Sequence, residues 1–323
     1  MSATAVRPDS DRQPGPAEPD RSNAPSLLDQ PRVIYAMVCF MTFLWGINFV
    51  MAKIALRFFP PLLVGPIRAC FAAALMLPIY FWSARRKGAS HSKPWNLRDL
   101  AVISALGICG ITLNQIFFVA GISRTSVAHG ALVIALSPVM VLLLAALRGQ
   151  EKITTRTFGG MMLAFAGVAT LNLGPGKSAQ GATVLGDVLV FLAGFSFALF
   201  AVFGKEITQR HDTVTVNTLG YASGAIAGLP LIWWEALKFD LTVVPMEGWL
   251  WLLYLAAFPS IIGYLIFYHA ITHMPASRVT SFSYAQPVIA ALAGLVVLSE
   301  PITATVAVGG AFVLCGVWIT SRR

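Results

Sequence analysis

Polar and aromatic residues stand in small groups inside the long apolar stretches of this sequence, and these are the side chains that could do chemistry. The groups are Trp45 and Asn48, Asn114 and Gln115, Tyr264 and Tyr268, and Tyr284 and Gln286. A small-molecule site needs a few placed polar groups among apolar walls. We therefore expect these residues to form a substrate-binding pocket. The alternative for each one alone is a hydrogen bond between helices.

Two ionisable residues lie deepest in the apolar stretches and are candidates for anion contact or ion coupling. Arg68 could bind an anion, but it lies near the end of its stretch, so its side chain could also extend to the membrane surface. Histidine titrates near physiological pH, which suits proton coupling at His129. Neither His129 nor His269 has a carboxylate at neighbouring helical spacing, which favours a neutral, hydrogen-bonded ring. Proton coupling and facilitated transport both stay open.

One stretch of the chain occurs twice. Residues 137–167 match residues 286–316, which lie 149 positions further on, and no gap is needed. Identical pairs include Pro138 and Pro287, Glu151 and Glu300, Gly160 and Gly309, and Gly167 and Gly316. A weaker match joins residues 43–53 to 195–205, and the first offset makes Tyr264 the partner of Gln115. A duplication of the chain is the simplest explanation.

The repeated glutamates lie at the membrane edges of this repeat. Glu151 and Glu300 are each followed, one residue further on, by an Ile-Thr pair that could begin the next helix. A carboxylate at that position can accept hydrogen bonds from the amide groups that begin a helix. We therefore favour helix capping over proton coupling for both residues.

Prolines and glycines within the spans suggest how the helices bend and pack. Pro138 and Pro287 fall near mid-span, where a proline kinks a helix and leaves a carbonyl group without its partner. Packing alone is the alternative for both. Gly220, Gly224 and Gly228 share one helix face, which permits close helix contact, either as static packing or as a sliding surface used in gating.

Composition restricts the chain to one broad class. It has 323 residues, of which 57% are hydrophobic and 11% charged, and its mean hydropathy is +0.73. A soluble protein of this length needs far more polar surface, so the sequence predicts an all-α polytopic membrane protein. The net charge of +9 lies mostly between apolar runs and reflects orientation, so we expect no nucleic-acid partner.

Ten apolar runs are long enough to cross a hydrocarbon core of about 30 Å. They lie near residues 33–55, 62–83, 99–121, 126–147, 156–173, 183–205, 216–237, 248–271, 278–298 and 304–320. Residues 1–31 lack the apolar core of a signal peptide and are rich in Pro, Asp, Arg and Ser, which predicts a disordered cytoplasmic tail.

The Lys and Arg residues predict the orientation of the ten spans. Of the 23 such residues, five lie on the side opposite the N-terminus, Arg68 lies within the second span, and the other 17 share the side of the N-terminus. Positive residues favour the cytoplasm, so both termini are expected there. With five spans each, residues 32–174 and 175–323 then enter the membrane from opposite sides, as inverted repeats.

Several kinds of catalytic site are missing from the sequence. No loop is long enough for a soluble ATPase domain, and the segment GPGKS at 174–178 has Leu171 where a phosphate-binding loop needs its first glycine. Metalloprotease and serine-hydrolase motifs are not found, and the four cysteines show no metal-ligand spacing. We expect no enzyme activity, no cofactor and no metal.

Several of these residues together form a familiar pattern. It comprises Trp45, Gly46, Asn48 and Phe49, the two Pro and Glu pairs of the repeat, Gly186 with Asp187, and the glycine-rich fifth and tenth spans. The pattern resembles the EamA-type drug/metabolite transporter superfamily over about residues 35–320. The resemblance implies ten helices in two inverted halves, a central cavity, and export or exchange of small metabolites such as amino acids.

The sequence thus predicts a permease of the inner membrane that exports or exchanges small, partly apolar metabolites by alternating access. Amino acids or related compounds are the expected substrates. A broad-specificity drug efflux permease is the alternative within transport. A non-transporting membrane enzyme acting on lipid, or a scaffold subunit, is the alternative from another class. Both a monomer and a homodimer fit the sequence.

Overall fold

The computed structural model describes residues 28, 30–87, 96–124, 130, 133–170, 184–298 and 304–321. These residues form helices and short connections with no strand among them, which confirms the all-α prediction for this part of the chain. Six segments are long and apolar enough to cross a membrane: Pro31–Ala55, Pro61–Arg85, Leu97–Ile122, Val184–Thr208, Met246–His273 and Ala276–Val297. Two shorter apolar helices cover Ser137–Leu147 and Ala307–Thr320.

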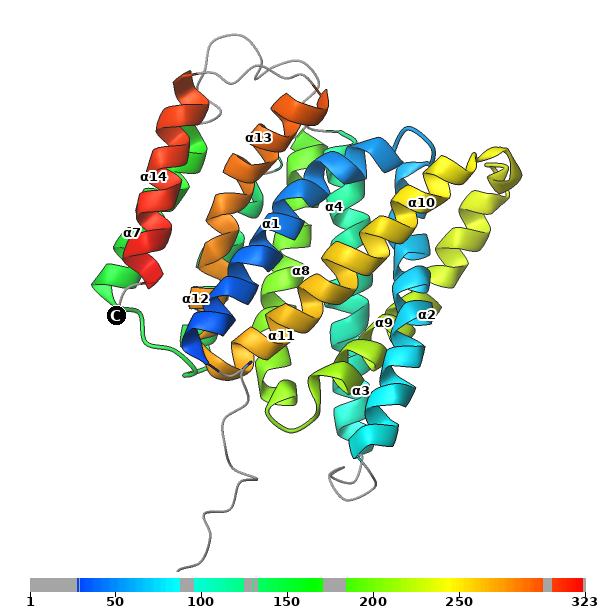
Figure 1. The fold of residues 1–323 in the computed structure, drawn as a ribbon, viewed down its shortest axis with the longest axis horizontal. Coiled ribbons are helices and arrows are strands. Elements are labelled where there is room, and N and C mark those ends of the chain that lie inside the picture. Colours follow the sequence, from blue (N-terminus) through cyan, green and yellow to red (C-terminus); the bar gives the residue numbers. More distant parts are fainter. Residues whose placement is uncertain are drawn as a thin grey trace, which may run out of the picture.

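The helices form one elongated bundle (Figure 1). From the first half of the sequence come α1 (Pro31–Ala55), α2 (Pro61–Lys87), α3 (Leu97–Gly107), the π-helical segment η4 (Ile108–Leu113), α4 (Asn114–Ile122), α6 (Ser137–Leu147) and α7 (Thr155–Thr170). From the second half come α8 (Val184–Thr208), α9 (Thr213–Ala236), η5 (Leu241–Val243), α10 (Met246–Leu255), the π-helical segment η6 (Ala256–Ile262), α11 (Gly263–His273), α12 (Ala276–Ser281), η7 (Phe282–Ala285), α13 (Gln286–Leu298) and α14 (Ala304–Ser321).

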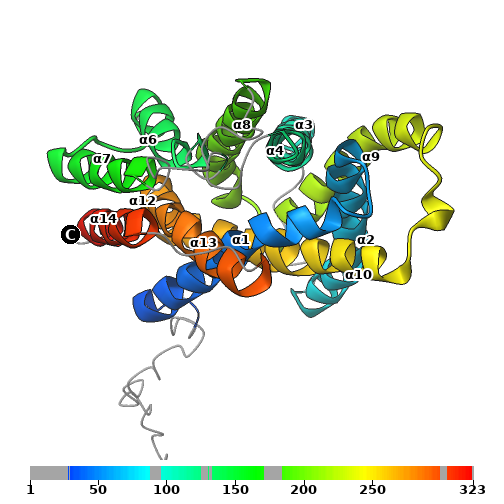
Figure 2. The same cartoon turned by 90° about the horizontal axis from the view of Figure 1, so that it is seen from above.

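Helices of the first half pack mainly against helices of the second. Among the largest contacts, α7 packs on α14, α2 on α9, α4 on α8 and α1 on α13. In the view from above, the α7–α14 pair lies at one end of the bundle and the α2–α9 pair lies toward the other (Figure 2). The core between them is therefore built jointly by the two halves.

The α7–α14 contact brings equivalent residues of the sequence repeat together. A Cβ atom at Gly316 would lie 2.6 Å from the carbonyl oxygen of Gly160, and one at Gly167 would lie 2.7 Å from that of Gly309. Gly160 thus faces the repeat partner of Gly167, and Gly167 faces the partner of Gly160. This pairing is antiparallel, and its close backbone approach leaves no room for a side chain.

A second shared feature is a π-helical turn inside one long helix of each half. Segment η4 interrupts the helix that runs from Leu97 to Ile122, and η6 interrupts the one from Met246 to His273. The repeat offset of 149 places residues 108–113 onto 257–262, almost the whole of η6. Sequence analysis missed both turns, since hydropathy does not distinguish a π-helical turn from an α-helical one.

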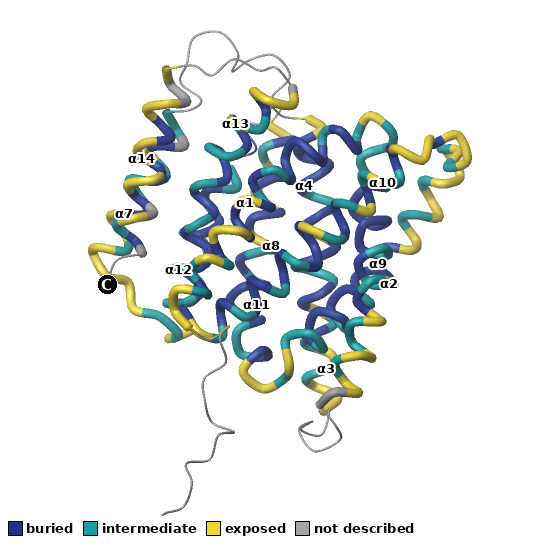
Figure 3. Tube along the Cα trace, viewed as in Figure 1, coloured by how far each residue is buried: buried dark blue, intermediate teal, exposed yellow. Residues whose placement is uncertain are grey.

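Buried residues lie toward the middle of the bundle and exposed ones toward its ends and outer helices (Figure 3). Many of the exposed residues are large and apolar. Trp233, Trp234, Leu147 and Val296 are among the exposed ones. A soluble protein rarely exposes so much apolar surface, and lipid is the environment that matches it. Together with the six apolar spans, this surface makes the chain a multi-pass membrane protein.

The two repeated prolines lie where the α-helical geometry of the chain is interrupted. Pro138 lies in the first turn of α6, and Pro287 is the second residue of α13, directly after the 3-10 turn η7. A proline fits the first turn of an α-helix because the amide group it lacks would have no partner there. Pro287 also lies at the middle of the span Ala276–Val297, as predicted, where the 3-10 turn η7 interrupts the α-helix. The span predicted around Pro138 lies partly outside the described residues.

The glycine face of α9 contacts α2, α3 and η4. Gly220 and Gly224 approach Gly107 of α3, and Gly228 approaches Pro66 of α2. The predicted close helix contact is therefore present, and in this structure it is a packed surface.

Glu151 caps a helix other than the one we predicted. Its Oε1 accepts a hydrogen bond from the backbone amide of Ser277 at 3.2 Å, and its Oε2 accepts one from the Ser277 hydroxyl. Ser277 lies in the first turn of α12, in the other half of the sequence. The helix that follows Glu151 is capped by Thr154, whose Oγ1 accepts from the amide of Thr157 at 3.1 Å. Glu300, the repeat partner of Glu151, lies outside the described residues.

Candidate functional site

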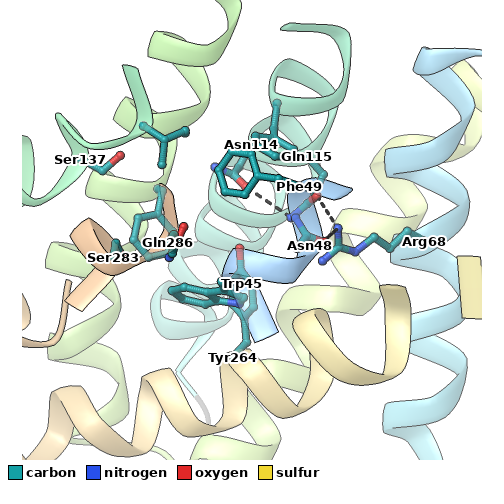
Figure 4. A pocket seen from close by; sticks show the side chains of 13 residues that line it. Trp45, Asn48, Phe49, Arg68, Asn114, Gln115, Ser137, Tyr264, Ser283 and Gln286 are labelled. Carbon is teal, nitrogen blue, oxygen red and sulfur yellow. Dashed lines mark hydrogen bonds between the residues drawn. The ribbon is translucent and has the colours of Figure 1, made fainter. Parts of the chain in front are cut away.

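A cavity of about 80 Å³ lies inside the bundle, between helices of both halves (Figure 4). That volume has space for several water molecules or a small polar group. The lining residues are Trp45, Asn48 and Phe49 of α1, Arg68 of α2, Asn114, Gln115 and Phe118 of α4, Ile134, Ser137 of α6, Phe197 of α8, Tyr264 of α11, Ser283 of η7 and Gln286 of α13. Amide and hydroxyl groups share the wall with aromatic rings, as in sites that bind small organic molecules.

Eight of the lining residues form four pairs related by the sequence repeat. The 149-residue offset pairs Gln115 with Tyr264, Ile134 with Ser283, and Ser137 with Gln286. The weaker match between α1 and α8 has an offset of 152 residues and pairs Trp45 with Phe197. The cavity therefore lies where equivalent parts of the two halves meet, although the side chains at equivalent positions differ.

Arg68 is buried at one wall of this cavity, with only 2% of its surface exposed. Its Nη1 donates to Asn48 Oδ1 and to Gln115 Oε1, both at 3.0 Å, and its Nε donates to Ser260 Oγ at 2.6 Å. Figure 4 shows the guanidinium group pointing toward Asn48 and Gln115. The alternative that this side chain extends to the membrane surface is wrong.

The bonds of Arg68 belong to a hydrogen-bonded chain that joins the two halves. On one side, Gln115 Nε2 lies 3.5 Å from Asn114 Oδ1, and Asn114 Nδ2 donates to the carbonyl group of Ala193 in α8 at 2.7 Å. On the other side, Ser260 Oγ donates to the carbonyl group of Leu255 at 3.0 Å. This chain fixes the position of the guanidinium group from both sides.

Arg68 also supplies the one charge among the thirteen lining residues. Its three hydrogen-bond acceptors are neutral oxygens, and no ion pair within the described part of the chain includes it. An arginine stays protonated in proteins, so the charge is permanent. The cavity is therefore electropositive at this wall.

Two aromatic side chains bind the carbonyl groups of the π-helical turns. Trp45 Nε1 donates to the carbonyl oxygen of Pro259 at 3.0 Å, and the Tyr264 hydroxyl donates to that of Gly110 at 3.3 Å. The acceptors are themselves repeat partners, 149 residues apart. The Trp45 and Tyr264 rings touch edge to face, with centroids 5.7 Å apart. The π-helical turns thereby position two aromatic walls of the cavity.

The structure brings six of the eight predicted pocket residues to the cavity. They are Trp45, Asn48, Asn114, Gln115, Tyr264 and Gln286. Tyr268 and Tyr284 are placed elsewhere. The Tyr268 ring packs on Phe200 with centroids 5.0 Å apart, and Tyr284 is fully buried in a small core with Leu142 and Val313. His129, the other candidate for ion coupling, lies outside the described residues.

Six lining residues were missed by sequence analysis: Phe49, Phe118, Ile134, Ser137, Phe197 and Ser283. The repeat could have found two of them, because Phe197 is the partner of Trp45 and Ser137 is the partner of Gln286. Ser137 is informative because its Oγ is buried and has no hydrogen-bond partner among the described residues. A buried hydroxyl group without a partner at a cavity wall is available to a bound molecule.

The lining residues have the chemistry of a binding site. Within the described ranges, no group of three or more His, Cys, Asp or Glu residues could hold a metal ion. The lining residues contain two serines but no histidine, lysine or carboxylate that could act as a general base for them. What the cavity offers is one positive charge, several amide and hydroxyl groups, and aromatic walls.

Comparison with known proteins agrees with this description. A family model described as "EamA-like transporter family" matches residues 32–173 and 184–322. An "Uncharacterized transporter" of Archaeoglobus fulgidus is 29% identical over 281 residues, covering 86% of this chain and 95% of that protein. A "Probable amino-acid metabolite efflux pump" of Salmonella typhimurium is 27% identical over 284 residues, covering 85% of this chain and 90% of that protein.

Two more comparisons extend this result. A "Probable terminal-alkyne amino-acid exporter" of Streptantibioticus cattleyicolor is 26% identical over 228 residues, covering 70% of this chain and 74% of that protein. A solved crystal structure superposes with a TM-score of 0.71 at 19% sequence identity, covering 90% of this chain and 96% of the other. At that identity the superposition concerns the fold alone.

Proposed function

The chain belongs to the EamA-like transporter family, and on this premise we propose that it is an inner-membrane permease that moves small metabolites by alternating access. Amino acids or related compounds are the proposed substrates, and export or exchange is the proposed direction. The names of two relatives, an amino-acid metabolite efflux pump and an amino-acid exporter, support this substrate class. No enzyme activity and no cofactor form part of the proposal.

The observation that carries the proposal is the position of the cavity between equivalent parts of the two halves. Four pairs of repeat-related residues line it. In transporters built from inverted repeats, the substrate site lies where the repeats meet, and the halves move around it. The permease should therefore bind its substrate at Trp45, Asn48, Gln115, Tyr264 and Gln286, and open to either side in turn.

The proposed topology has ten transmembrane helices in two inverted repeats, residues 32–174 and 175–323, with both termini in the cytoplasm. Reporter fusions test it directly. A reporter fused after Lys87 should be cytoplasmic, and one fused after Lys177 should be external. The reverse pattern would overturn the orientation, and the same location for both fusions would contradict the number of spans between them.

Transport in proteoliposomes tests the function. The purified chain would be reconstituted and assayed for counterflow of each proteinogenic amino acid, with and without a pH gradient. We expect saturable flux for at least one partly apolar amino acid and reduced flux after alanine substitution of Asn48, Gln115 or Gln286. No flux for any of them would contradict the substrate class, and flux unaffected by a protonophore would exclude proton coupling.

Drug efflux is the second transport function, and the same variants distinguish it. A broad-specificity site relies on apolar contact and should tolerate the loss of single polar groups. The hydrogen-bonded chain through Arg68 favours a dedicated substrate, because each of its members has a defined partner. Unchanged transport in all three alanine variants, at normal expression, would instead support broad efflux.

A further inference from the structure

From the surroundings of Arg68 we infer that the cavity recognises a small monocarboxylate, whose carboxylate group binds the Arg68 guanidinium. The inference rests on the proposed permease function and adds to it the chemical group of the substrate that the site recognises and the residue that binds it. For this, the Arg68 guanidinium must be buried, must have a nitrogen atom free to bind a ligand, and must have no counter-ion among the described residues. The structure meets each requirement.

The first step is that the charge at Arg68 lies in a low-dielectric environment. The residue is 2% exposed, and it lies on α2 inside one of the six apolar spans. Burying a charge inside a membrane protein is expensive, so such residues usually line a substrate path or pair with an opposite charge. For Arg68 the described residues supply only neutral oxygens, from Asn48, Gln115 and Ser260.

The second step is that part of the guanidinium group is still available. Its hydrogen bonds use Nε and Nη1, and no bond to a described residue uses Nη2. Arg68 nevertheless lines the cavity. The planar guanidinium group binds a carboxylate through parallel hydrogen bonds, and such charge-assisted bonds are stronger than neutral ones.

The third step concerns the charge of the ligand. The guanidinium group is the one positive charge that lines the cavity, so it can pair with one carboxylate group, and a second carboxylate would be buried without an opposite charge. The opposite wall carries the Ser137 hydroxyl, which is buried and has no hydrogen-bond partner among the described residues, together with Ser283 and Gln286 (Figure 4). These groups suit a second polar group of the ligand.

The fourth step concerns the body of the ligand between these two polar walls. The rings of Trp45 and Phe197 meet edge to face with centroids 5.6 Å apart, and those of Phe49 and Phe118 do so at 5.1 Å. Both pairs line the cavity. The ligand is therefore a short carboxylate with a partly apolar body, a description that includes amino acids and their deaminated acids.

The second half of the chain has no counterpart of this charge. Helix α9, which packs on α2 and follows α8 as α2 follows α1, contains neither lysine nor arginine. The duplication therefore produced one anion site and not a symmetric pair. The site takes a single carboxylate at one wall of an otherwise shared cavity.

Ligand-induced thermal stabilisation of the purified full chain in detergent tests the inference without requiring transport. The probes are the apolar amino acids, their deaminated acids such as 4-methylpentanoate, their amides such as leucinamide, and inorganic phosphate. At least one amino acid or deaminated acid should stabilise the protein, and its amide should bind at least about thirty-fold more weakly. Equal binding of acid and amide, binding of phosphate alone, or no binding of any carboxylate would overturn the inference.

Two isosteric variants test the role of Arg68 itself. Asn48→Asp and Gln115→Glu place a carboxylate at an atom that now lies 3.0 Å from Arg68 Nη1. The internal carboxylate should occupy the guanidinium group and weaken carboxylate binding at least about thirty-fold, with no loss of folding because the buried charge gains a partner. Lys238→Gln, which removes a charge at the surface, is the matched control. Wild-type carboxylate binding in both acidic variants would overturn the inference.

Counterflow assays of the same proteins separate this inference from the permease proposal. Carboxylate binding without flux of any probe would contradict the permease and leave the site intact. Flux of an uncharged or cationic compound that Asn48→Asp leaves unchanged would support the permease and overturn the carboxylate site. Arg68→Gln should lose carboxylate binding as well, and the isosteric variants decide the matter if that protein does not fold.

Discussion

The two halves of the sequence meet in two places, and these differ in whether residues at equivalent positions are the same. At the α7–α14 contact, the glycines at equivalent positions are the same in both copies, and Gly160 and Gly167 face the partners of each other. At the cavity, equivalent positions carry different residues, such as Ser137 and Gln286. Close backbone packing permits one solution, so both copies kept it. A binding site for an asymmetric molecule requires different groups on its two sides, so the copies diverged.

The comparison also distinguishes backbone features that both halves share from side chains that differ between them. The π-helical turns η4 and η6 lie at equivalent positions, and their carbonyl groups at Gly110 and Pro259 each accept one aromatic donor. The backbone irregularity is thus common to both halves, while the donors, Trp45 and Tyr264, come from positions that are not equivalent. Substitutions at the contact should therefore change stability, and substitutions at the cavity should change transport.

The largest effect is expected at the α7–α14 contact. Gly316→Val places a side chain against the backbone of Gly160 and Ala164. Neither helix can withdraw without losing the other glycine contacts, so we expect a loss of about 3 kcal/mol in stability. Thermal unfolding of the purified protein in detergent measures it.

The control for this prediction lies on the partner helix of the same contact. Gly159→Ala adds a methyl group where no atom lies within 4 Å. It should leave the unfolding temperature unchanged or slightly raise it. Equal behaviour of Gly316→Val and Gly159→Ala would break the comparison, because the contact would then not depend on close backbone approach.

A smaller effect is expected where Glu151 binds the N-terminus of α12. This contact also joins the halves, but it uses hydrogen bonds to Ser277 in place of backbone packing. Glu151→Ala should lower stability by about 1 to 2 kcal/mol, as the loss of a helix cap does. Thermal unfolding measures this change, with Lys152→Ala as the exposed neighbouring control. A loss as large as that of Gly316→Val would mean that capping and packing are equally important between the halves.

Trp45→Phe tests a cavity position by making it identical to its partner Phe197. The substitution removes the hydrogen bond to the carbonyl oxygen of Pro259. We expect a loss of about 1 kcal/mol in stability and a clear fall in counterflow rate, since the ring also forms a cavity wall. Phe43→Leu on the exposed face of α1 is the control. Normal transport by Trp45→Phe would show that transport does not require different residues at these two equivalent positions.

The smallest effect on stability is expected at Ser137. Its buried Oγ has no partner among the described residues, so Ser137→Ala removes an unsatisfied group and should change stability by less than about 0.5 kcal/mol in either direction. Counterflow should nevertheless need several-fold more substrate for half-maximal rate. Thermal unfolding and a substrate titration on the same sample make this separation visible. A large loss of stability together with normal transport would assign Ser137 to packing.

The helical class and the repeat were predictable because both depend on patterns along the chain. Apolar runs locate spans, and the 149-residue offset relates Gln115 to Tyr264 through their positions in the sequence alone. The same offset applied to Gln286 would have found Ser137. Tyr268 and Tyr284 were placed in the pocket from depth alone, and depth does not say which side of a helix faces the cavity.

Other features depend on contacts between distant parts of the chain. Glu151 binds Ser277, 126 residues away, and nothing near either residue predicts that partner. Arg68 was expected to reach either an anion or the membrane surface, and the acceptors that hold it inside come from three other elements, including Ser260 in a π-helical turn. Pro259 within η6 is a local signal for a break in the α-helix, whereas η4 contains no proline and has no such signal.

The charge at Arg68 has an electrical consequence for the proposed permease. With a monocarboxylate bound that has no other charge, such as a deaminated acid, the cavity contains no net charge, so reorientation of the loaded protein moves no net charge through the membrane field. A zwitterionic amino acid would leave the charge of the cavity unchanged. The empty protein returns with its positive charge uncompensated. A potential of 100 mV acts on one full charge with about 2.3 kcal/mol. Voltage should therefore govern the return of the empty protein, which makes exchange of one substrate for another less sensitive to membrane potential than net export.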